Sequence, residues 1–177
     1  MIRLERKFAS LKENSQKALV AYLVAGDPDI STTLELMHQF VLSGVDIIEL
    51  GVPFTDPIAE GPIIQAAHDR SLQANTSLDM IFSLVEEFRS KDSETPVILM
   101  GYINTFLANS KALESIHERG TDAVLIVDVP GESSLEDIGI QNKNIASISL
   151  ISPTTDNDRI QKICMSSSGF IYYVTLR

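Results

Sequence analysis

Two stretches of this sequence repeat one pattern, SGVDIIELGVP at residues 43–53 and RGTDAVLIVDVP at residues 119–130. Each has a glycine at a position typical of the end of a helix, followed by an aspartate, an apolar run and a proline. The pattern predicts a helix that ends near Gly44 or Gly120 and leads directly into a buried strand. Helices that alternate with such strands are typical of a parallel α/β sheet.

The rest of the chain extends this alternation. Short, nearly continuous apolar runs indicate strands that are buried on both faces. We predict strands at residues 18–26, 46–52, 96–102, 122–129, 145–152 and 170–176. Helical periodicity lies between them at residues 31–44 and 77–91, where Ser31 and Ser77 are candidate N-caps. Residues 131–144 are too short for an ordinary crossover helix, and we expect an irregular connection there.

Two architectures fit this pattern, an open doubly wound sheet and a (β/α)8 barrel. The first strand is followed by no GxGxxG motif, which weakens the dinucleotide-binding form of the doubly wound sheet. In both architectures functional groups gather at the carboxyl ends of the strands. Polar residues at or after these ends are Asp27, Glu49, Tyr102, Asn104, Asp128 and Ser152, and we expect them to share one site. Six strands are too few to close an eight-stranded barrel.

Composition limits the class of protein. The 177 residues are 44% hydrophobic and 21% charged, which is typical of a single globular domain over residues 1–177. The net charge of -10 disfavours binding to nucleic acid or to an anionic membrane. The single cysteine, Cys164, can form no internal disulfide, so we predict a cytoplasmic location. Cys164 has no CxxC partner and falls in a predicted helix, so we expect it to pack in the protein interior. The three histidines, His38, His68 and His117, have no metal-ligand spacing and are predicted to lie on helix surfaces, so no metal site is expected.

Six stretches also carry a resemblance to a known family. They are YLVAGDP (22–28), GVDIIELGVPFTDPIAEGPIIQAA (44–67), ILMGYIN (98–104), GTDAVLIVDVP (120–130), ISPTT (151–155) and GFIYYV (169–174). In order and spacing they resemble the tryptophan synthase alpha chain over essentially the whole sequence. The resemblance implies a (β/α)8 TIM barrel that is incomplete here, with about six βα units and an N-terminal helix in residues 1–14. The C-terminal strands and helices of the family barrel have no counterpart in these 177 residues.

The resemblance implies an activity and a partner. The family is a carbon–carbon lyase of L-tryptophan biosynthesis, which cleaves indole-3-glycerol phosphate to indole and glyceraldehyde 3-phosphate by a retro-aldol reaction. It works in an α2β2 assembly with a beta chain that holds pyridoxal phosphate, so no cofactor is expected in this chain. The family's glycine-rich phosphate loops have no counterpart here, which implies weak binding of the substrate phosphate.

Three alternatives stay open at this point. The first is a non-catalytic or fragmentary homologue that only binds and activates a beta chain. The second is another phosphate-binding barrel, against which Glu49 in ELGVPFTDP argues, and the third is a fragment without function.

The resemblance also assigns roles to individual residues. Glu49 matches the general acid–base position of the family; without the resemblance it would be read as a buried glutamate paired with lysine or arginine. Glu60 stands where the family has an aspartate that binds the indole N–H, and the longer side chain either is absorbed by its loop or weakens turnover. The remaining matches are Tyr22, Met100 and Tyr172 in the indole pocket, Tyr102 near the substrate glycerol, and Asp56 and Asn104 in loops that face the beta chain.

Overall fold

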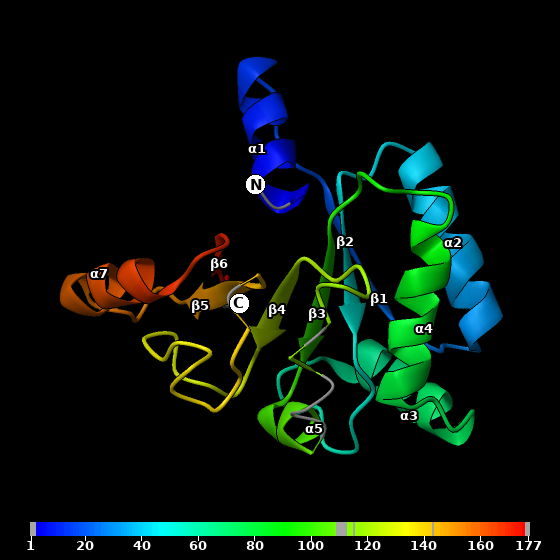
Figure 1. The fold of residues 1–177 in the computed structure, drawn as a ribbon. Helices are drawn as coiled ribbons and strands as arrows, with labels where there is room; N and C mark the ends of the chain where they lie inside the picture. Colours follow the sequence, from blue (N-terminus) through cyan, green and yellow to red (C-terminus); the bar gives the residue numbers. More distant parts are fainter. Residues whose placement is uncertain (1–2, 109–112, 115, 143, 176–177) are drawn as a thin grey trace.

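A computed structural model of the chain describes residues 3–108, 113–114, 116–142 and 144–175 (Figure 1). The sheet consists of β1 (Val20–Val24), β2 (Ile47–Gly51), β3 (Val97–Gly101), β4 (Ala123–Ile126), β5 (Ala146–Ile151) and β6 (Ile171–Tyr173). All five pairings are parallel, and the strands lie in the order β1-β2-β3-β4-β5-β6. A doubly wound sheet would reverse its order partway, so this sheet is the wall of a barrel. The six predicted strands are confirmed, each shorter than predicted.

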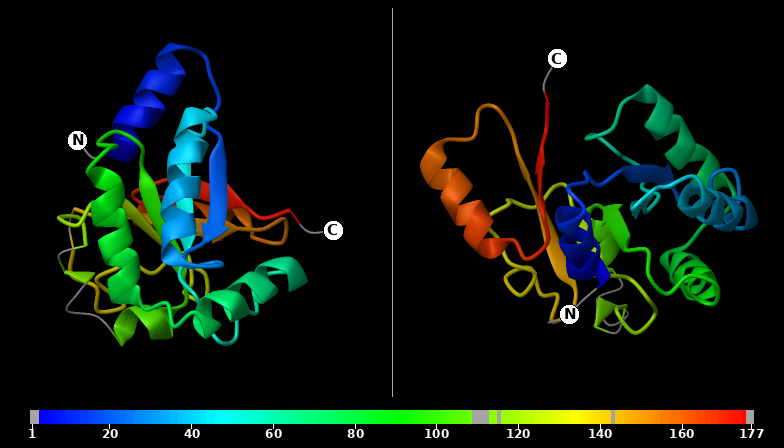
Figure 2. Two further views of the ribbon diagram at one scale, coloured as in Figure 1. Left: turned by 90° about the vertical axis from the view of Figure 1, so that its right-hand side faces the viewer. Right: turned by 90° about the horizontal axis from the view of Figure 1, so that it is seen from above.

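The described helices are α1 (Arg3–Glu13), α2 (Ile30–Leu42), α3 (Pro62–Gln73), α4 (Leu78–Arg89), α5 (Ile103–Leu107) and α7 (Asn157–Ser166). Figures 1 and 2 show α2 and α4 side by side on the outer face of the sheet, with α1 standing at one end. The predicted N-terminal helix and the predicted irregular link are both confirmed, the link by turns over residues 131–142 and 144. None of the described helices has the length and apolar character needed to cross a membrane.

The repeated glycine pattern ends in the same local structure at both of its positions. Gly44 has φ +91° and Gly120 has φ +100°, a backbone conformation that favours glycine. After Gly44, the Val45 N–H donates to the carbonyl of Phe40 at 3.0 Å, which closes the last turn of α2. The predicted passage from helix end to buried strand is therefore confirmed at Gly44, whereas the described residues before Gly120, 116–119, form a turn that leads into β4.

The two predicted N-caps have different outcomes. The Ser77 hydroxyl accepts the Met80 N–H at 3.3 Å and caps α4, as predicted. The prediction for Ser31 was wrong, because the N-cap of α2 lies two residues earlier, at Asp29. The Asp29 carboxylate accepts the Thr32 N–H at 2.7 Å, and a carboxylate at a helix N-terminus also favours the helix dipole.

The central strands β2, β3 and β4 are largely buried on both faces, which explains their continuous apolar runs, whereas β1 and β6 are mostly half-buried. Successive side chains of a strand point to opposite faces, so Ile48 and Leu50 enter the outer cluster against the helices, whereas Ile47 enters the inner cluster. The buried residues of the inner cluster are Leu4, Ile47, Ile98, Ala123, Leu125, Ala146 and Ile148. Glu49 follows Ile47 by two positions, so its side chain lies on the inner face, at the carboxyl end of β2.

The opposite, amino end of the sheet is held by a buried ionic network. Asp122 is 3% exposed and accepts hydrogen bonds from Arg89 Nη2 at 2.9 Å, Arg3 Nη1 at 3.1 Å and the Val97 N–H at 2.9 Å. These contacts tie α1 and α4 to the strands. The amino end of the sheet therefore serves stability and leaves the carboxyl end for chemistry.

Candidate active site

A pocket of about 370 Å³ opens at the carboxyl end of the sheet. Its lining is Tyr22, Glu49, Ala59, Glu60, Gly61, Ile64, Met100, Leu125, Leu150, Tyr172, Tyr173 and Val174. Five residues that the sequence marked as candidates are brought together here, and two of them are carboxylates on an otherwise largely apolar and aromatic wall. This size and lining suit a small, mostly apolar ligand that two acidic groups orient.

Glu49 lies at the centre of this arrangement. It is 4% exposed and stands beside Tyr22 in the register of β1 and β2. The Tyr172 hydroxyl donates a hydrogen bond to the Glu49 carboxylate. Tyr172 comes from β6, four strands away from β2, so only the curvature of the sheet brings these groups into contact.

The environment of Glu49 favours its protonated form. Burial raises the pKa of the Glu49 carboxyl, and the hydrogen bond from Tyr172 offsets part of that effect. Among the described residues no lysine or arginine forms an ion pair with Glu49, so the structural alternative of a buried ion pair was wrong. A carboxyl with a raised pKa in a cleft is the type of group that can both give and take a proton near neutral pH.

Glu60 is held in place by the loop that carries it. The Tyr102 hydroxyl donates to the Glu60 carboxylate and accepts the Ala59 N–H at 3.0 Å. The ring of Tyr102 stacks on Phe54 with centroids 4.7 Å apart and an interplanar angle of 18°. Tyr102 is 2% exposed and stands behind Glu60, beside the pocket and not on its wall. The Glu60 carboxylate is therefore fixed by a tyrosine that the backbone of the same loop holds in place.

The expectation that all polar strand-end residues share one site was wrong. Asp27 forms a paired contact with Arg70, with both N–O distances 2.7 Å, and the Asp128 carboxylate accepts the Ile103 N–H at 2.8 Å where α5 begins. Ser152 bonds within its own turn. Of the six, only Glu49 lines the pocket. The first residues after a strand must also satisfy the backbone amides of the loops and helices that follow, and several of these side chains do so.

Two single-residue predictions also need correction. His68 was predicted on a helix surface but is 1% exposed, because α3 turns this face toward β1 and the loop after β2. Cys164 was predicted to pack but is exposed, because α7 buries the preceding residue, Ile163, and the next position points away. Asp56 and Asn104 are both exposed, Asp56 in the loop after β2 and Asn104 on α5.

The sequence analysis missed several residues of the pocket wall. Leu125 lies on the inner face next to Met100 in the register of β3 and β4, and Leu150 pairs with Tyr172 in the register of β5 and β6. Alternation along the strands could have identified both. Ile64 lies in the first turn of α3, directly after the loop that carries Glu60.

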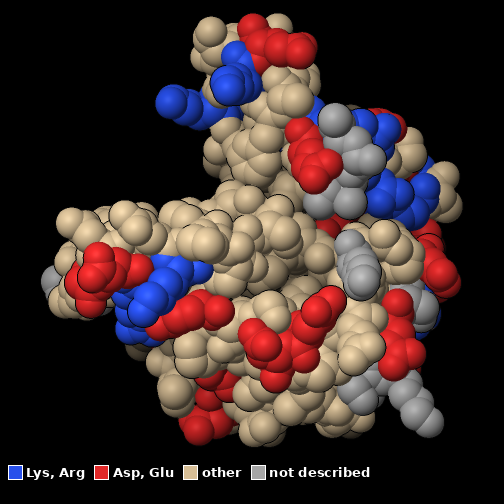
Figure 3. Space-filling view, turned by 60° about the vertical axis from the view of Figure 1, so that its left-hand side comes forward, with Lys and Arg blue, Asp and Glu red and all other residues tan. Residues whose placement is uncertain are grey.

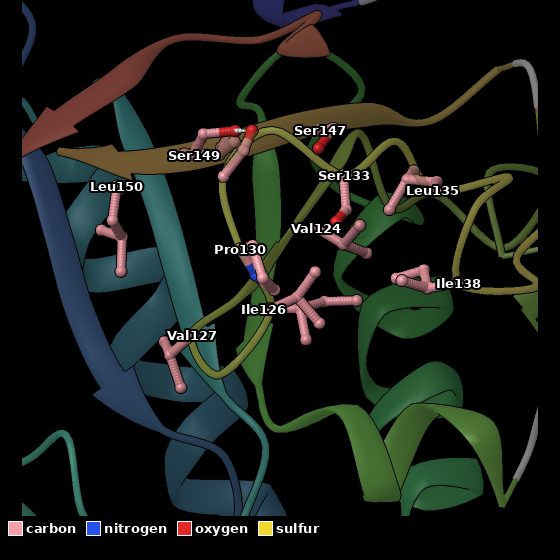
Figure 4. A pocket seen from close by; sticks show the side chains of 13 residues that line it. Val124, Ile126, Val127, Pro130, Ser133, Leu135, Ile138, Ser147, Ser149 and Leu150 are labelled. Carbon is pink, nitrogen blue, oxygen red and sulfur yellow. Dashed lines mark hydrogen bonds between the residues drawn. The ribbon is translucent and has the colours of Figure 1, made fainter. Parts of the chain in front are cut away.

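A second cavity lies between β4, β5 and the link that follows β4 (Figure 4). Its volume is about 50 Å³, enough for a few water molecules and too small for an aromatic ring. Val124, Ile126, Ser133 and Ser149 are among its lining residues. No group of His, Cys, Asp or Glu in the described parts of the chain is placed to hold a metal ion.

Fold and pocket together define a parallel α/β barrel whose chemical groups meet at the carboxyl ends of the strands. A family model described as the tryptophan synthase alpha chain matches residues 8–177. The chain belongs to the tryptophan synthase alpha chain family, and the family resemblance found in the sequence is confirmed.

Individual relatives agree with this assignment. The chain is 43% identical over 180 residues to the tryptophan synthase alpha chain of Acinetobacter baylyi, covering 100% of this chain and 67% of that protein. The crystal structure of tryptophan synthase subunit alpha from Legionella pneumophila has a TM-score of 0.93 and 40% identity, with 100% of this chain and 70% of that chain covered. The structure of the tryptophan synthase a2b2 complex from Pyrococcus furiosus has a TM-score of 0.82 and 36% identity, with 90% of this chain and 66% of that chain covered. Across curated bacterial relatives the chain spans 64% to 68% of their length.

Proposed function

We propose that this chain carries the catalytic groups of a carbon–carbon lyase that cleaves indole-3-glycerol phosphate to indole and glyceraldehyde 3-phosphate in L-tryptophan biosynthesis. One observation carries the proposal. A buried carboxyl with a raised pKa, Glu49, lies in the same pocket as a second carboxylate, Glu60, on a wall that suits an indole ring. Family membership supports the same reaction.

The two carboxyl groups would divide the work of a retro-aldol cleavage. Protonated Glu49 gives its proton to C3 of the indole ring, and Glu60 stabilises the positive charge that develops at the ring nitrogen by accepting its N–H. The Glu49 carboxylate then takes the proton of the C3' hydroxyl. The C3–C3' bond breaks, its electrons return to the ring to give indole, and C3' becomes the aldehyde carbon. Glu49 ends the cycle in the protonation state in which it began.

The remaining candidate residues would hold the substrate. Tyr22, Met100 and Tyr172 form apolar and aromatic wall positions around the ring, and Tyr172 also binds Glu49 directly. Tyr102 would act through Glu60, since its hydroxyl is already bound to that carboxylate. The phosphate loops of the family have no counterpart in these 177 residues, so we assign to this chain the indole end of the substrate.

We propose a beta chain as the partner, in an α2β2 assembly whose pyridoxal phosphate belongs to the beta chain, with no cofactor in this one. Support comes from the Pyrococcus furiosus relatives, which were studied as an a2b2 complex, and from the exposed positions of Asp56 and Asn104 at the carboxyl end of the sheet. We place the reaction in the cytoplasm, where a free, exposed cysteine such as Cys164 stays reduced. The face in Figure 3 carries mixed acidic and basic groups and no broad basic surface, which fits a small-molecule substrate better than nucleic acid.

The test is indole release from indole-3-glycerol phosphate, measured with and without a beta chain. Glu49→Gln should abolish release, whereas Glu35→Gln, on the exposed side of α2, should not change it. Absence of release from the unmodified protein under both conditions would overturn the proposal. If the beta chain were nevertheless stimulated, the protein would be a binding partner that lacks the lyase activity.

A further inference from the structure

We infer that His68 is a positioning residue for this pocket: from α3 it fixes both the Tyr22 hydroxyl and the loop that carries Glu60. The inference rests on the proposed function for its catalytic meaning, but its geometry stands independently. His68 is 1% exposed and contacts two elements that build different walls of the pocket. No part of the reaction scheme above uses it.

The hydrogen bonds of His68 define its tautomer. The backbone N–H of Phe54 donates to His68 Nδ1 at 3.1 Å, so Nδ1 carries no proton. The proton of the neutral ring is therefore on Nε2, which faces the Tyr22 hydroxyl oxygen at 3.4 Å. Burial lowers the pKa of His68, against the opposing effect of Glu60 and Asp69, and this favours the neutral ring that the contacts require.

Tyr22 is fixed on a second side by the backbone of β2. A Cβ added at Gly51 would lie 2.1 Å from the Tyr22 hydroxyl oxygen, so this position of the phenol requires glycine at residue 51. Because the oxygen accepts the proton of His68 Nε2, the hydrogen of the Tyr22 hydroxyl is left to donate elsewhere. Tyr22 lines the same pocket as Glu49 and Glu60 and pairs with Glu49 in the register of β1 and β2. Burial, and then the charges of Glu60 and Glu49, raise the pKa of Tyr22, so its hydroxyl keeps its proton.

The other nitrogen of His68 acts on Glu60 through the loop. Phe54, whose N–H is bound to Nδ1, stacks on the ring of Tyr102. Tyr102 in turn donates to Glu60 and accepts the Ala59 N–H. A single buried imidazole therefore sets the place of a pocket hydroxyl through Nε2 and the place of a pocket carboxylate through Nδ1.

Two substitutions separate these contacts. Asparagine places its side-chain oxygen near the position of Nδ1, so His68→Asn keeps an acceptor for Phe54 and loses the donor to Tyr22. Glutamine places its amide nitrogen near Nε2, so His68→Gln keeps the donor to Tyr22 and loses the acceptor for Phe54. Ser71→Ala is the matched control, since Ser71 is equally buried on α3 but bonds to the carbonyl of Ala25, outside the pocket.

The experiment uses the 177-residue chain and three readouts. Imidazole ¹⁵N NMR reports the tautomer of His68, amide hydrogen exchange reports the Ala59 N–H, and titration with indole reports the pocket. We expect the Nε2–H tautomer in the unmodified chain. The Ala59 N–H should exchange faster in His68→Gln than in His68→Asn. Both variants should bind indole roughly two- to tenfold more weakly, which is the range for one lost hydrogen bond. Ser71→Ala should leave Ala59 exchange and affinity near their original values.

An Nδ1–H tautomer would overturn the inference. It would also be overturned if His68→Asn and His68→Gln had the same Ala59 exchange rate and the same indole affinity as Ser71→Ala. Failure of the unmodified chain to bind indole would count against the proposed function. In that case the tautomer and the Ala59 exchange still decide whether His68 positions the loop.

Discussion

Replacing Glu60 with aspartate tests whether the loop is built around the longer side chain. The sequence alone leaves both outcomes open, since aspartate is the residue of the family pattern. The contact with Tyr102 favours a loss of activity. Removing one methylene withdraws the carboxylate by about 1.5 Å from the Tyr102 hydroxyl, which the Ala59 N–H holds in place. A hydrogen bond to a charged group contributes roughly 1.5–3 kcal/mol, so kcat/KM should fall about ten- to a hundredfold.

The assay is steady-state cleavage of indole-3-glycerol phosphate in the presence of a beta chain. Tyr102→Phe is the companion variant, because it removes the same hydrogen bond and keeps the stacking on Phe54. If the same hydrogen bond accounts for both losses, kcat/KM of the double variant should be only slightly lower than that of the less active single variant. An unchanged or higher rate for Glu60→Asp, or fully additive losses, would refute the reasoning and show that the loop follows the family geometry.

Three further predictions follow from the pocket and its surroundings. Glu49→Gln should abolish indole release, since general acid–base groups contribute roughly a hundredfold or more, and a variant that keeps more than about a tenth of the activity would exclude Glu49 as the proton carrier. The folded protein favours the protonated Glu49 carboxyl, because the pKa of this group is raised. The stability that Glu49 contributes is therefore complete below its ordinary pKa of 4.5 and is lost as pH rises. In denaturant unfolding, Glu49→Gln should be more stable than the unmodified protein at neutral pH, and this difference should vanish in acid. Asp56→Lys should weaken association with a beta chain and leave the circular dichroism spectrum unchanged, and equal affinity in calorimetry would place the interface elsewhere.

Phosphate affinity belongs with these tests. A longer chain that supplies two further βα units should bind glycerol 3-phosphate more tightly than these 177 residues, because barrel phosphate sites use main-chain amides from the last two loops. Equal affinity by calorimetry would show that the phosphate site has been misplaced.

The sequence was most informative where one local rule decides the structure. The apolar runs predicted all six strands. The signal is clearest for β2 and β4, because a strand buried on both faces leaves few positions for polar residues. Gly44 predicted the end of α2, and Gly120 predicted the entry to β4, because few other residues adopt that backbone conformation. The N-cap of α2 was wrong because Asp29 and Ser31 are both good caps, and the choice depends on where the first turn begins.

The pocket could be predicted only in part, because its contacts join residues far apart in the chain. Position on a strand placed Glu49 correctly. It did not separate Glu49 from Asp27 and Asp128, which bind α3 and the start of α5. The burial of His68 depends on how α3 lies against β1, which helical periodicity alone does not determine. The contact of Tyr172 with Glu49 depends on the curvature of the whole sheet.

The agreement between strand order and chain order has a consequence for synthesis on the ribosome. β1 meets its partner β2 in the pairing of Val20 with Ile47, and every later strand adds to the one made just before it. No strand has to wait for a distant segment, so the wall can grow from its N-terminal end while translation proceeds. Tyr172, however, reaches Glu49 only after β6 has emerged. A nascent chain would therefore hold a packed outer layer of helices well before it holds a pocket that can bind its ligand.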